Sequence, residues 1–173
     1  EIAAILRDNT LQLQKLIENL LNFNVAISRA FTLHVEPVAL RELIYNVLRD
    51  HKVAVLARQI VLDVSLQPVE IQGDRAKLCT VVDNLVSNAI KFSPENGRLR
   101  VYLESRDGQA IIEVADSGPG IPEEERRRVF DAFYQGSNTA NGHVRGTGLG
   151  LSIAREYAQA HGGYIEVIDG ENA

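Results

Sequence analysis

The sequence has little cysteine, no long apolar run and no excess of positive charge. Its single cysteine, Cys79, has no partner in the chain for a disulfide, which favours a reducing compartment. Cys79 lies just before Val81 and Val82 and is predicted to be a small buried hydrophobic residue. No stretch approaches the roughly 20 apolar residues of a membrane-spanning helix, and the acidic start is unlike a secretory signal. The chain as given is expected to be soluble and cytoplasmic.

The net charge of −5 and the pI of 5.4 give no basic footprint, so nucleic-acid binding is disfavoured. With 173 residues, 45% hydrophobic and 24% charged, the composition is typical of one globular domain with an attached helical segment. The chain begins inside a helical pattern and stops just after a strand-like run. We therefore expect a fragment of a longer protein.

The first 30 residues carry a heptad pattern. Apolar or seam positions alternate four and three residues apart at Ile2, Leu6, Asn9, Leu13, Leu16, Leu20, Phe23 and Ile27. Ile5, Ile17 and Leu21 widen this stripe beyond a two-stranded seam, which favours a helical bundle. Residues 1–30 are thus predicted to be one long bundle-forming helix that needs a partner helix. Residues 31–173 are predicted to form a separate domain.

The second part of the chain alternates between strand and helix patterns. Extended runs are predicted at 31–33, closed by Glu36-Pro37, and at 60–66, 69–72, 99–103, 110–115 and 164–168, with 69–72 pairing with 60–66. Asp107-Gly108 supplies a two-residue hairpin turn between the fourth and fifth of these. Helices are predicted at 40–56, at 75–92 with Asp74 as N-cap, after Pro122, and from about Gly150 to the Gly162-Gly163 stop. His51 and His161 are predicted to lie on helix surfaces.

The predicted helix 75–92 carries a polar stripe among apolar residues. Asn84, Asn88 and Lys91 stand at i, i+4 and i+7, so they fall within roughly 60° of one another around the axis. Alone, such a stripe also suits a solvated helix face. The rest of the circumference is apolar, however, and a buried amide without a partner costs about 1–3 kcal/mol. We expect a polar group to meet this stripe.

Seven of the thirteen glycines lie between Gly118 and Gly150. The stretch Gly146–Leu151 opens a helix and can hold a phosphate with its backbone N–H groups, although it also fits an ordinary loop and cap. The chain has no G-x-x-x-x-G-K-[ST] motif, and G-x-G-x-G lacks the dinucleotide-fold spacing. Asp116, at a strand end, can accept from an adenine amino group. With Phe92 over the base, Asn88 on Mg²⁺ and Lys91 on phosphate, these residues predict a nucleotide site.

Four segments carry a family resemblance. Asp83–Phe92, Asp116–Pro122, Val129–Tyr134 and Gly146–Leu151 resemble, in order and spacing, the N, G1, F and G2 boxes of sensor histidine kinases. The resemblance implies an ATP-binding catalytic domain of the Bergerat type: a two-layer α/β sandwich with a mixed sheet packed on three helices. Residues 1–29 then resemble the second helix of the dimerisation and phosphotransfer hairpin, which implies a homodimer in the complete protein.

The resemblance also implies roles for individual residues. Asn88 is similar to the Mg²⁺ ligand, Asn84 and Lys91 to phosphate-side contacts, and Phe92 to the residue against adenine. Asp116 resembles the adenine-reading acid, and residues 135–145 resemble a mobile lid over ATP. The remaining nucleotide contacts implied by the four boxes and the lid are Gly118, Gly120, Ile121, Tyr134, Arg145, Gly146, Thr147, Gly148, Leu149, Gly150 and Leu151.

Two departures from the family pattern are visible. No bundle helix with a phosphoacceptor histidine is present, since His34 lies in the extended segment before the second domain. Gln135 stands where many relatives carry a basic residue, for which Arg145 is a candidate substitute. The chain is therefore expected to need an acceptor helix from elsewhere. A response-regulator receiver domain is the expected partner, and the parent protein is expected to be anchored in the bacterial inner membrane.

Two other functions stay open at this point. Gyrase, Hsp90 and MutL relatives that hydrolyse ATP carry a glutamate one turn before the Mg²⁺-binding asparagine, whereas this chain has Asn84 there. Asp83 points about 100° away from that direction. The other alternative is a degenerate scaffold that binds partners without catalysis, for which Gln135 is the only support. Histidine kinase chemistry is the leading hypothesis.

Overall fold

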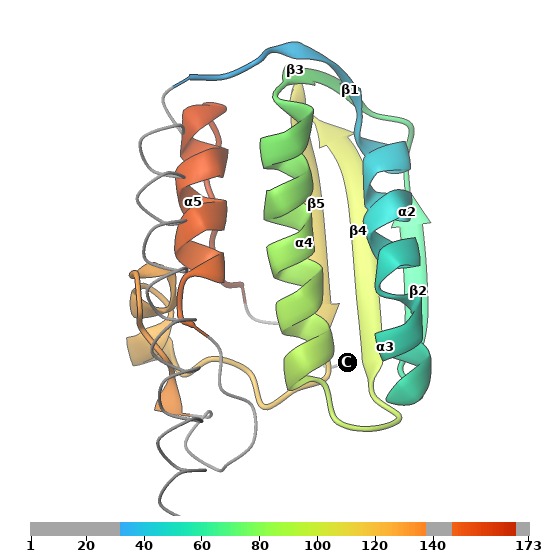
Figure 1. Ribbon diagram of the computed structural model, residues 1–173, viewed down its shortest axis with the longest axis vertical. Coiled ribbons are helices and arrows are strands. Elements are labelled where there is room, and N and C mark those ends of the chain that lie inside the picture. Colours follow the sequence, from blue (N-terminus) through green and yellow to red (C-terminus); the bar gives the residue numbers. More distant parts are fainter. Residues whose placement is uncertain (1–31, 138–146, 169–173) are drawn as a thin grey trace, which may run out of the picture.

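The computed structural model describes residues 32–137 and 147–168. The bundle helix predicted for residues 1–30 lies outside them. The elements, in chain order, are β1 (Glu36–Ala39), α2 (Leu40–Asp50), α3 (Lys52–Ala57), β2 (Val61–Leu66), β3 (Glu70–Gly73), α4 (Arg75–Phe92), β4 (Arg98–Arg106), β5 (Gln109–Asp116), the 3₁₀ turns η1 (Glu123–Glu125) and η2 (Arg128–Phe130), and α5 (Gly150–Ala160). The α-helices form one layer that covers one face of the main sheet (Figure 1).

The main sheet has the strand order β2-β4-β5 and is mixed. β2 runs parallel to β4, whereas β4 and β5 form an antiparallel hairpin. Asp107 and Gly108 both have positive φ, of 52° and 77°, as the two-residue turn of a hairpin requires. The predicted hairpin is confirmed, and it places the end of β5, at Asp116, opposite Leu99 at the start of β4.

The core lies between the sheet and the helices. Leu99, Val101 and Leu103 of β4 are fully buried, as their alternation with polar neighbours predicts. Val82 and Val86 of α4 pack into the same cluster, together with Leu43, Ile44 and Val47 of α2. The predicted two-layer α/β sandwich is confirmed.

The second sheet corrects the predicted pairing of residues 69–72. β3 pairs antiparallel with β1, not with β2. β1 itself runs through Pro37, where the sequence predicts the end of an extended run that begins at 31–33. An edge strand tolerates proline because its missing N–H faces away from the ladder. The two strands bring the start of the domain next to the N-terminus of α4.

Three other expectations about local structure are corrected. The helix predicted over 40–56 is divided into α2 and α3 at His51. After Pro122 only the 3₁₀ turns η1 and η2 form, because the charged run Glu123–Arg128 offers no apolar stripe to bury. Residues 164–168 keep an alternation of more and less exposed side chains but make no ladder within the described part of the chain.

Helix α4 begins and ends where the sequence predicts. The side chain of Asp74 accepts a hydrogen bond from the Lys77 backbone N–H at 3.1 Å, so the predicted N-cap is confirmed. Burial alone would raise the pKa of Asp74, but hydrogen bonds from Lys77 and His34 lower it well below the usual range. Cys79, by contrast, is exposed on α4 and not buried.

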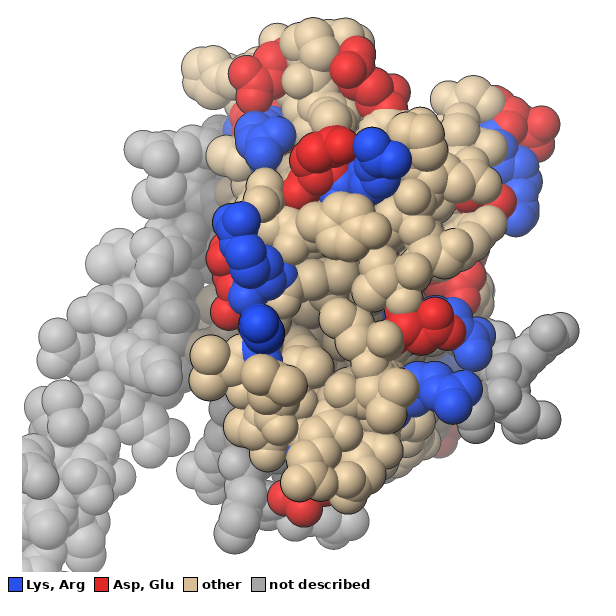
Figure 2. Space-filling view, turned by 90° about the vertical axis from the view of Figure 1, so that its right-hand side faces the viewer, with Lys and Arg blue, Asp and Glu red and all other residues tan. Residues whose placement is uncertain are grey.

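The face formed by α2, α3 and β2 carries acidic and basic side chains close together (Figure 2). Arg41 pairs with Glu42 at 3.3 Å, and Arg100 pairs with Asp63 at 3.6 Å. Both pairs are largely solvent-exposed, so each contributes little to stability.

Candidate functional site

The polar stripe of α4 lies half-buried beside α5. The Asn84 side chain donates from Nδ2 to the Thr80 carbonyl at 2.9 Å. Its Oδ1 packs so closely on the start of α5 that a Cβ at Gly150 would lie 2.5 Å away. Asn84 therefore connects the N box to the G2 box. The Asn88 side chain makes no hydrogen bond within the described residues, so its amide oxygen is available to a ligand.

Lys91 and Phe92 form the last turn of α4. The Lys91 ammonium lies 4.9 Å from the centre of the Phe92 ring, in a cation–π contact. Burial lowers the pKa of Lys91 because desolvation disfavours the charged form. A partly desolvated ammonium interacts strongly with an anion that reaches it. The turn presents an aromatic ring and a cation together.

Asp116 ends β5 and turns back on its own loop. Its Oδ1 accepts a hydrogen bond of 2.7 Å from the Gly118 backbone N–H. Burial raises the pKa of Asp116, an effect that this hydrogen bond partly offsets. A Cβ at Gly118 would lie 2.5 Å from that oxygen and 2.7 Å from the Phe92 carbonyl oxygen. The absence of a side chain at Gly118 thus lets the G1 turn contact the end of α4.

The F and G2 boxes meet through backbone contacts. Phe133 has φ of 65°, and its N–H donates to the Gly148 carbonyl at 2.8 Å. Gly148 has φ of 71°, and a Cβ there would lie 2.6 Å from the Phe133 carbonyl carbon. Only glycine suits this position, because both the conformation and the close approach exclude a side chain. Gly148 precedes α5, so the F-box contact positions the start of that helix.

The remaining predicted contacts fall around these three junctions. Tyr134 follows η2, with the Arg128 guanidinium 4.6 Å from its ring centre. Thr147 accepts from the Leu149 N–H at 3.4 Å, and Leu149 is buried. Leu151 lies in the first turn of α5. Arg145, Gly146 and most of the predicted lid lie outside the described residues.

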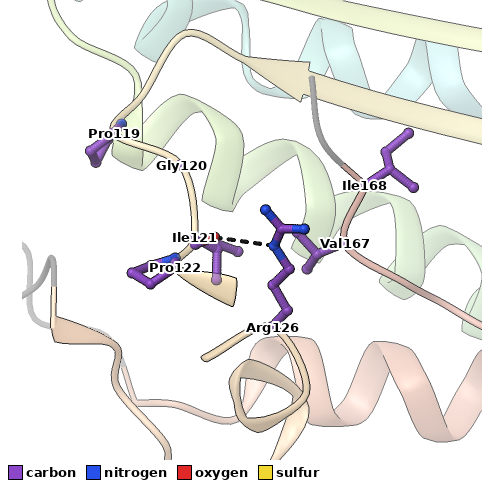
Figure 3. A pocket seen from close by; sticks show the side chains of 7 residues that line it. All are labelled: Pro119, Gly120, Ile121, Pro122, Arg126, Val167 and Ile168. Atoms are coloured by element: carbon purple, nitrogen blue, oxygen red, sulfur yellow. Dashed lines mark hydrogen bonds between the residues drawn. The ribbon is translucent and has the colours of Figure 1, made fainter. Parts of the chain in front are cut away.

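A pocket of about 390 Å³ opens beside the G1 turn, where Gly120 has φ of 70° (Figure 3). Arg126 extends across it and donates from Nε to the Ile121 carbonyl at 3.3 Å. The other residues that line it are Pro119, Gly120, Pro122, Val167 and Ile168. The predicted contacts Gly120 and Ile121 therefore border an open space with both polar and apolar lining.

Two residues that hold these parts together are not indicated by the sequence. His161 is not a surface residue: its Nε2 accepts from the Asp74 N–H at 2.9 Å, and its Nδ1 lies 2.6 Å from the Tyr157 carbonyl oxygen. This places the end of α5 against the start of α4. The other is Arg58, whose guanidinium donates to the Lys91 and Ser93 carbonyls. Neither residue stands in a motif that predicts a long-range contact, although Gly162-Gly163 marks the helix end beside His161.

Comparisons with known proteins point to one family. Residues 73–173 match the family model described as histidine kinase-, DNA gyrase B- and HSP90-like ATPase. The sensor histidine kinase GlrK of Escherichia coli (strain K12) is 34% identical over 169 residues, which are 98% of this chain and 35% of GlrK. The chain therefore spans about a third of the length of this relative.

Solved structures agree with the sequence comparisons. Full-length ShkA in complex with AMPPNP has a TM-score of 0.77 at 29% identity, covering 96% of this chain and 35% of ShkA. The histidine kinase ThkA, in complex with the response regulator protein TrrA, has a TM-score of 0.73 at 26% identity, covering 97% and 46%. The predicted likeness to sensor histidine kinases is confirmed: the chain belongs to the family of histidine kinase-, DNA gyrase B- and HSP90-like ATPases and is similar to the catalytic regions of sensor histidine kinases.

Proposed function

We propose that this chain binds ATP between α4, the G1 turn and the start of α5, and transfers the γ-phosphoryl group to a histidine on a bundle helix. The observation that carries the proposal is the convergence of the boxes: Phe92 on Gly118, Asn84 on Gly150, and Phe133 on Gly148. Segments up to about 66 residues apart in sequence meet around one end of α4 and α5. Their polar and glycine residues are the ones a nucleotide needs.

The adenine lies at the end formed by Asp116, Phe92 and the G1 turn. The Asp116 carboxylate keeps acceptor capacity beyond the bond from Gly118, since each oxygen can accept more than one hydrogen bond. It accepts from the exocyclic amino group of adenine. The apolar lining at Ile121 supports the base.

Asn88 is the residue that would hold Mg²⁺. The ion prefers oxygen ligands and usually keeps several waters, with substrate phosphates completing its shell. An amide oxygen without a protein partner fits that role, and the described residues offer no cluster of three or more His, Cys, Asp or Glu side chains for a metal. When bound, the ion neutralises charge on the phosphate oxygens.

Phosphate groups lie between Lys91 and the N-terminus of α5. Gly148 and Gly150 let the start of α5 pack closely on Phe133 and Asn84, and the N-terminus of a helix attracts an anion through its backbone N–H groups and its dipole. Thr147, Leu149 and Leu151 supply the rest of this loop, and Arg145 and Gly146 precede it. Positioning and charge neutralisation then carry most of the catalysis of phosphoryl transfer.

Transfer to histidine is favoured over direct hydrolysis of ATP. One turn before Asn88 stands the amide of Asn84, whose Nδ2 is engaged with Thr80. The neighbouring carboxylate, Asp83, lies 2.7 Å from His51 Nε2 at the junction of α2 and α3. It is thereby held on the other side of α4 from α5. Neither residue can activate a water at the phosphate end, so the acceptor is a side chain brought by another helix.

The partners follow from that reaction. The acceptor histidine lies on a dimerisation helix that packs on residues 1–29, and the phosphoryl group passes to an aspartate of a response-regulator receiver domain. The complex of ThkA with TrrA supports this step. No helix among the described residues is long and apolar enough to cross a membrane. The parent protein is proposed to be a membrane-anchored homodimer through its other segments.

Calorimetric titration of the chain with ATP, with and without Mg²⁺, tests the binding step. Asn88→Ala should remove the Mg²⁺-dependent part of the affinity, and Asp116→Ala should weaken binding of ATP and AMP alike. Asp63→Ala is the control, because Asp63 is an exposed carboxylate of β2 that pairs with Arg100 on the main sheet. Titrations of Asn88→Ala and Asp116→Ala that match the unmodified chain would refute the proposal.

A further inference from the structure

Arg58, at the end of α3, reaches the last turn of the helix that carries the N box. We infer that Arg58 is a positioning residue for the adenine end of the nucleotide site, an inference that rests on the proposed function. It acts by holding the last turn of α4, where Phe92 meets the G1 turn. No part of the four sequence boxes includes it.

The end of α3 places Arg58 next to the C-terminus of α4. Arg58 is the C-cap of α3, and the next residue, Gln59, has φ of 54°. The Ile60 N–H then donates to the Val55 carbonyl at 3.0 Å, which closes the helix end. The chain turns sharply into β2 at this point. The Arg58 side chain is left directed at the neighbouring C-terminus of α4.

Arg58 holds that C-terminus by both its side chain and its backbone. Its Nη1 donates to the Lys91 carbonyl at 3.3 Å and its Nη2 to the Ser93 carbonyl at 2.5 Å. Its own carbonyl accepts from the Asn96 N–H at 3.0 Å. The last carbonyls of a helix have no partner within the helix, and a cation there also interacts favourably with the helix dipole. The Arg58 guanidinium supplies hydrogen-bond donors to these carbonyls and a positive charge at the C-terminal end of the helix dipole.

The anchored turn is the one that the G1 loop contacts. The Phe92 carbonyl, between the two that Arg58 binds, lies against Gly118, and Gly118 donates to Asp116. The start of β4, which follows the loop after α4, is joined to the G1 turn as well, since the Arg98 N–H donates to Ser117 Oγ at 2.7 Å. Movement of the α4 terminus would therefore displace both the Phe92 ring and the Asp116 carboxylate.

The position of the anchor predicts which part of ATP is affected. Asn88 lies one turn before Phe92 and is held within continuous helix, so the metal end does not depend on Arg58. Loss of the guanidinium should weaken recognition of the base and leave the Mg²⁺ dependence of binding unchanged. It should also reduce the preference for adenine over guanine, because a displaced Asp116 accepts less well from the amino group of adenine.

The test compares Arg58→Met with Arg49→Met, which removes a guanidinium that is about 71% exposed on α2. Calorimetry on the full chain should give ATP and AMP affinities about tenfold weaker for Arg58→Met, which corresponds to about 1.4 kcal/mol. The preference for ATP over GTP should fall, while the factor by which Mg²⁺ strengthens ATP binding stays the same. Arg49→Met should match the unmodified chain in every measurement.

Arg58→Lys provides a milder second variant, since an ammonium keeps the charge but cannot bind both carbonyls in the same fork. It should give affinities between those of the unmodified chain and Arg58→Met. Unchanged ATP affinity and base preference in Arg58→Lys and in any folded Arg58→Met would overturn the inference. If Asp116→Ala binds ATP normally, the proposed site itself is wrong; if Asp116→Ala loses binding and the Arg58 variants do not, only the role of Arg58 fails.

Discussion

Replacement of Gly118 by alanine probes the contact on which the proposed adenine end of the site depends. The added methyl carbon would lie 2.5 Å from Asp116 Oδ1 and 2.7 Å from the Phe92 carbonyl oxygen. Both distances are well inside van der Waals contact, and the second neighbour is backbone at the end of an 18-residue helix. Relief of the clash requires the G1 turn to move away from α4 and Asp116 to leave its bond with the Gly118 N–H.

The size of the effect follows from these two changes. Overpacking of a closely fitted contact costs about 1–3 kcal/mol, and a hydrogen bond to a charged group contributes about 1.5–3 kcal/mol. We expect Gly118→Ala to lower the free energy of unfolding by at least about 2.5 kcal/mol, or about 5–10 °C in Tm. Displacement of Asp116 should weaken ATP binding by about ten- to a hundredfold.

Thermal melts and calorimetric titration with ATP measure both effects, and Gly108→Ala is the matched control. Gly108 has φ of 77°, and no heavy atom lies within 4 Å of the position that a Cβ would take there. Alanine at Gly108 should therefore cost about 1 kcal/mol through backbone strain alone, with no change in ATP affinity. Unchanged ATP affinity in Gly118→Ala would refute the proposed contact between the G1 turn and α4.

Three further predictions concern stability and pH. Because the pKa of Asp116 is raised, its ionised form opposes folding at neutral pH. Asp116→Asn should therefore raise Tm at neutral pH, and the gain in Tm should shrink as pH falls through the Asp116 pKa. Calorimetry should show weaker ATP binding by the same variant. The pKa of Asp74 is lowered, so its contribution is present above the ordinary aspartate pKa of about 3.9 and is lost as pH falls below it. Asp74→Ala should lower the free energy of unfolding by about 1–2 kcal/mol at neutral pH. In urea titrations below about pH 3, the difference between this variant and the unmodified chain should be smaller. Leu103→Ala, at a fully buried position, should cost about 2–5 kcal/mol in the same titrations.

Local signals predicted the elements that build the site. The Asp74 cap and the Ser93-Pro94 stop delimit α4, and the Asp107-Gly108 turn defines the hairpin that ends at Asp116. In these segments the capping residue, the turn chemistry and the apolar period all favour the same structure. The two elements that carry Asn88 and Asp116 could therefore be predicted from neighbouring residues alone.

Contacts between distant segments could not be predicted in this way. The charged run after Pro122 resembles a helix at its ends, yet it has no apolar face and forms only 3₁₀ turns. β3 pairs with β1 because the chain returns there after β2, which no period-two pattern encodes. In the sequence alone, Arg58 and His161 look like surface residues. Their hydrogen-bond partners are distant along the chain, since Lys91 lies 33 positions from Arg58 and Asp74 lies 87 positions from His161.

Transfer of phosphate to a histidine, instead of to water, is the central proposal for this chain. The direct measurement is incubation with γ-³²P-ATP and Mg²⁺ together with a separate bundle-helix hairpin that carries the acceptor histidine. We predict acid-labile label on that histidine, lost in Asn88→Ala and Asp116→Ala, with little free phosphate released. Release of free phosphate at a rate unaffected by the hairpin, with no label on the histidine, would contradict the proposal.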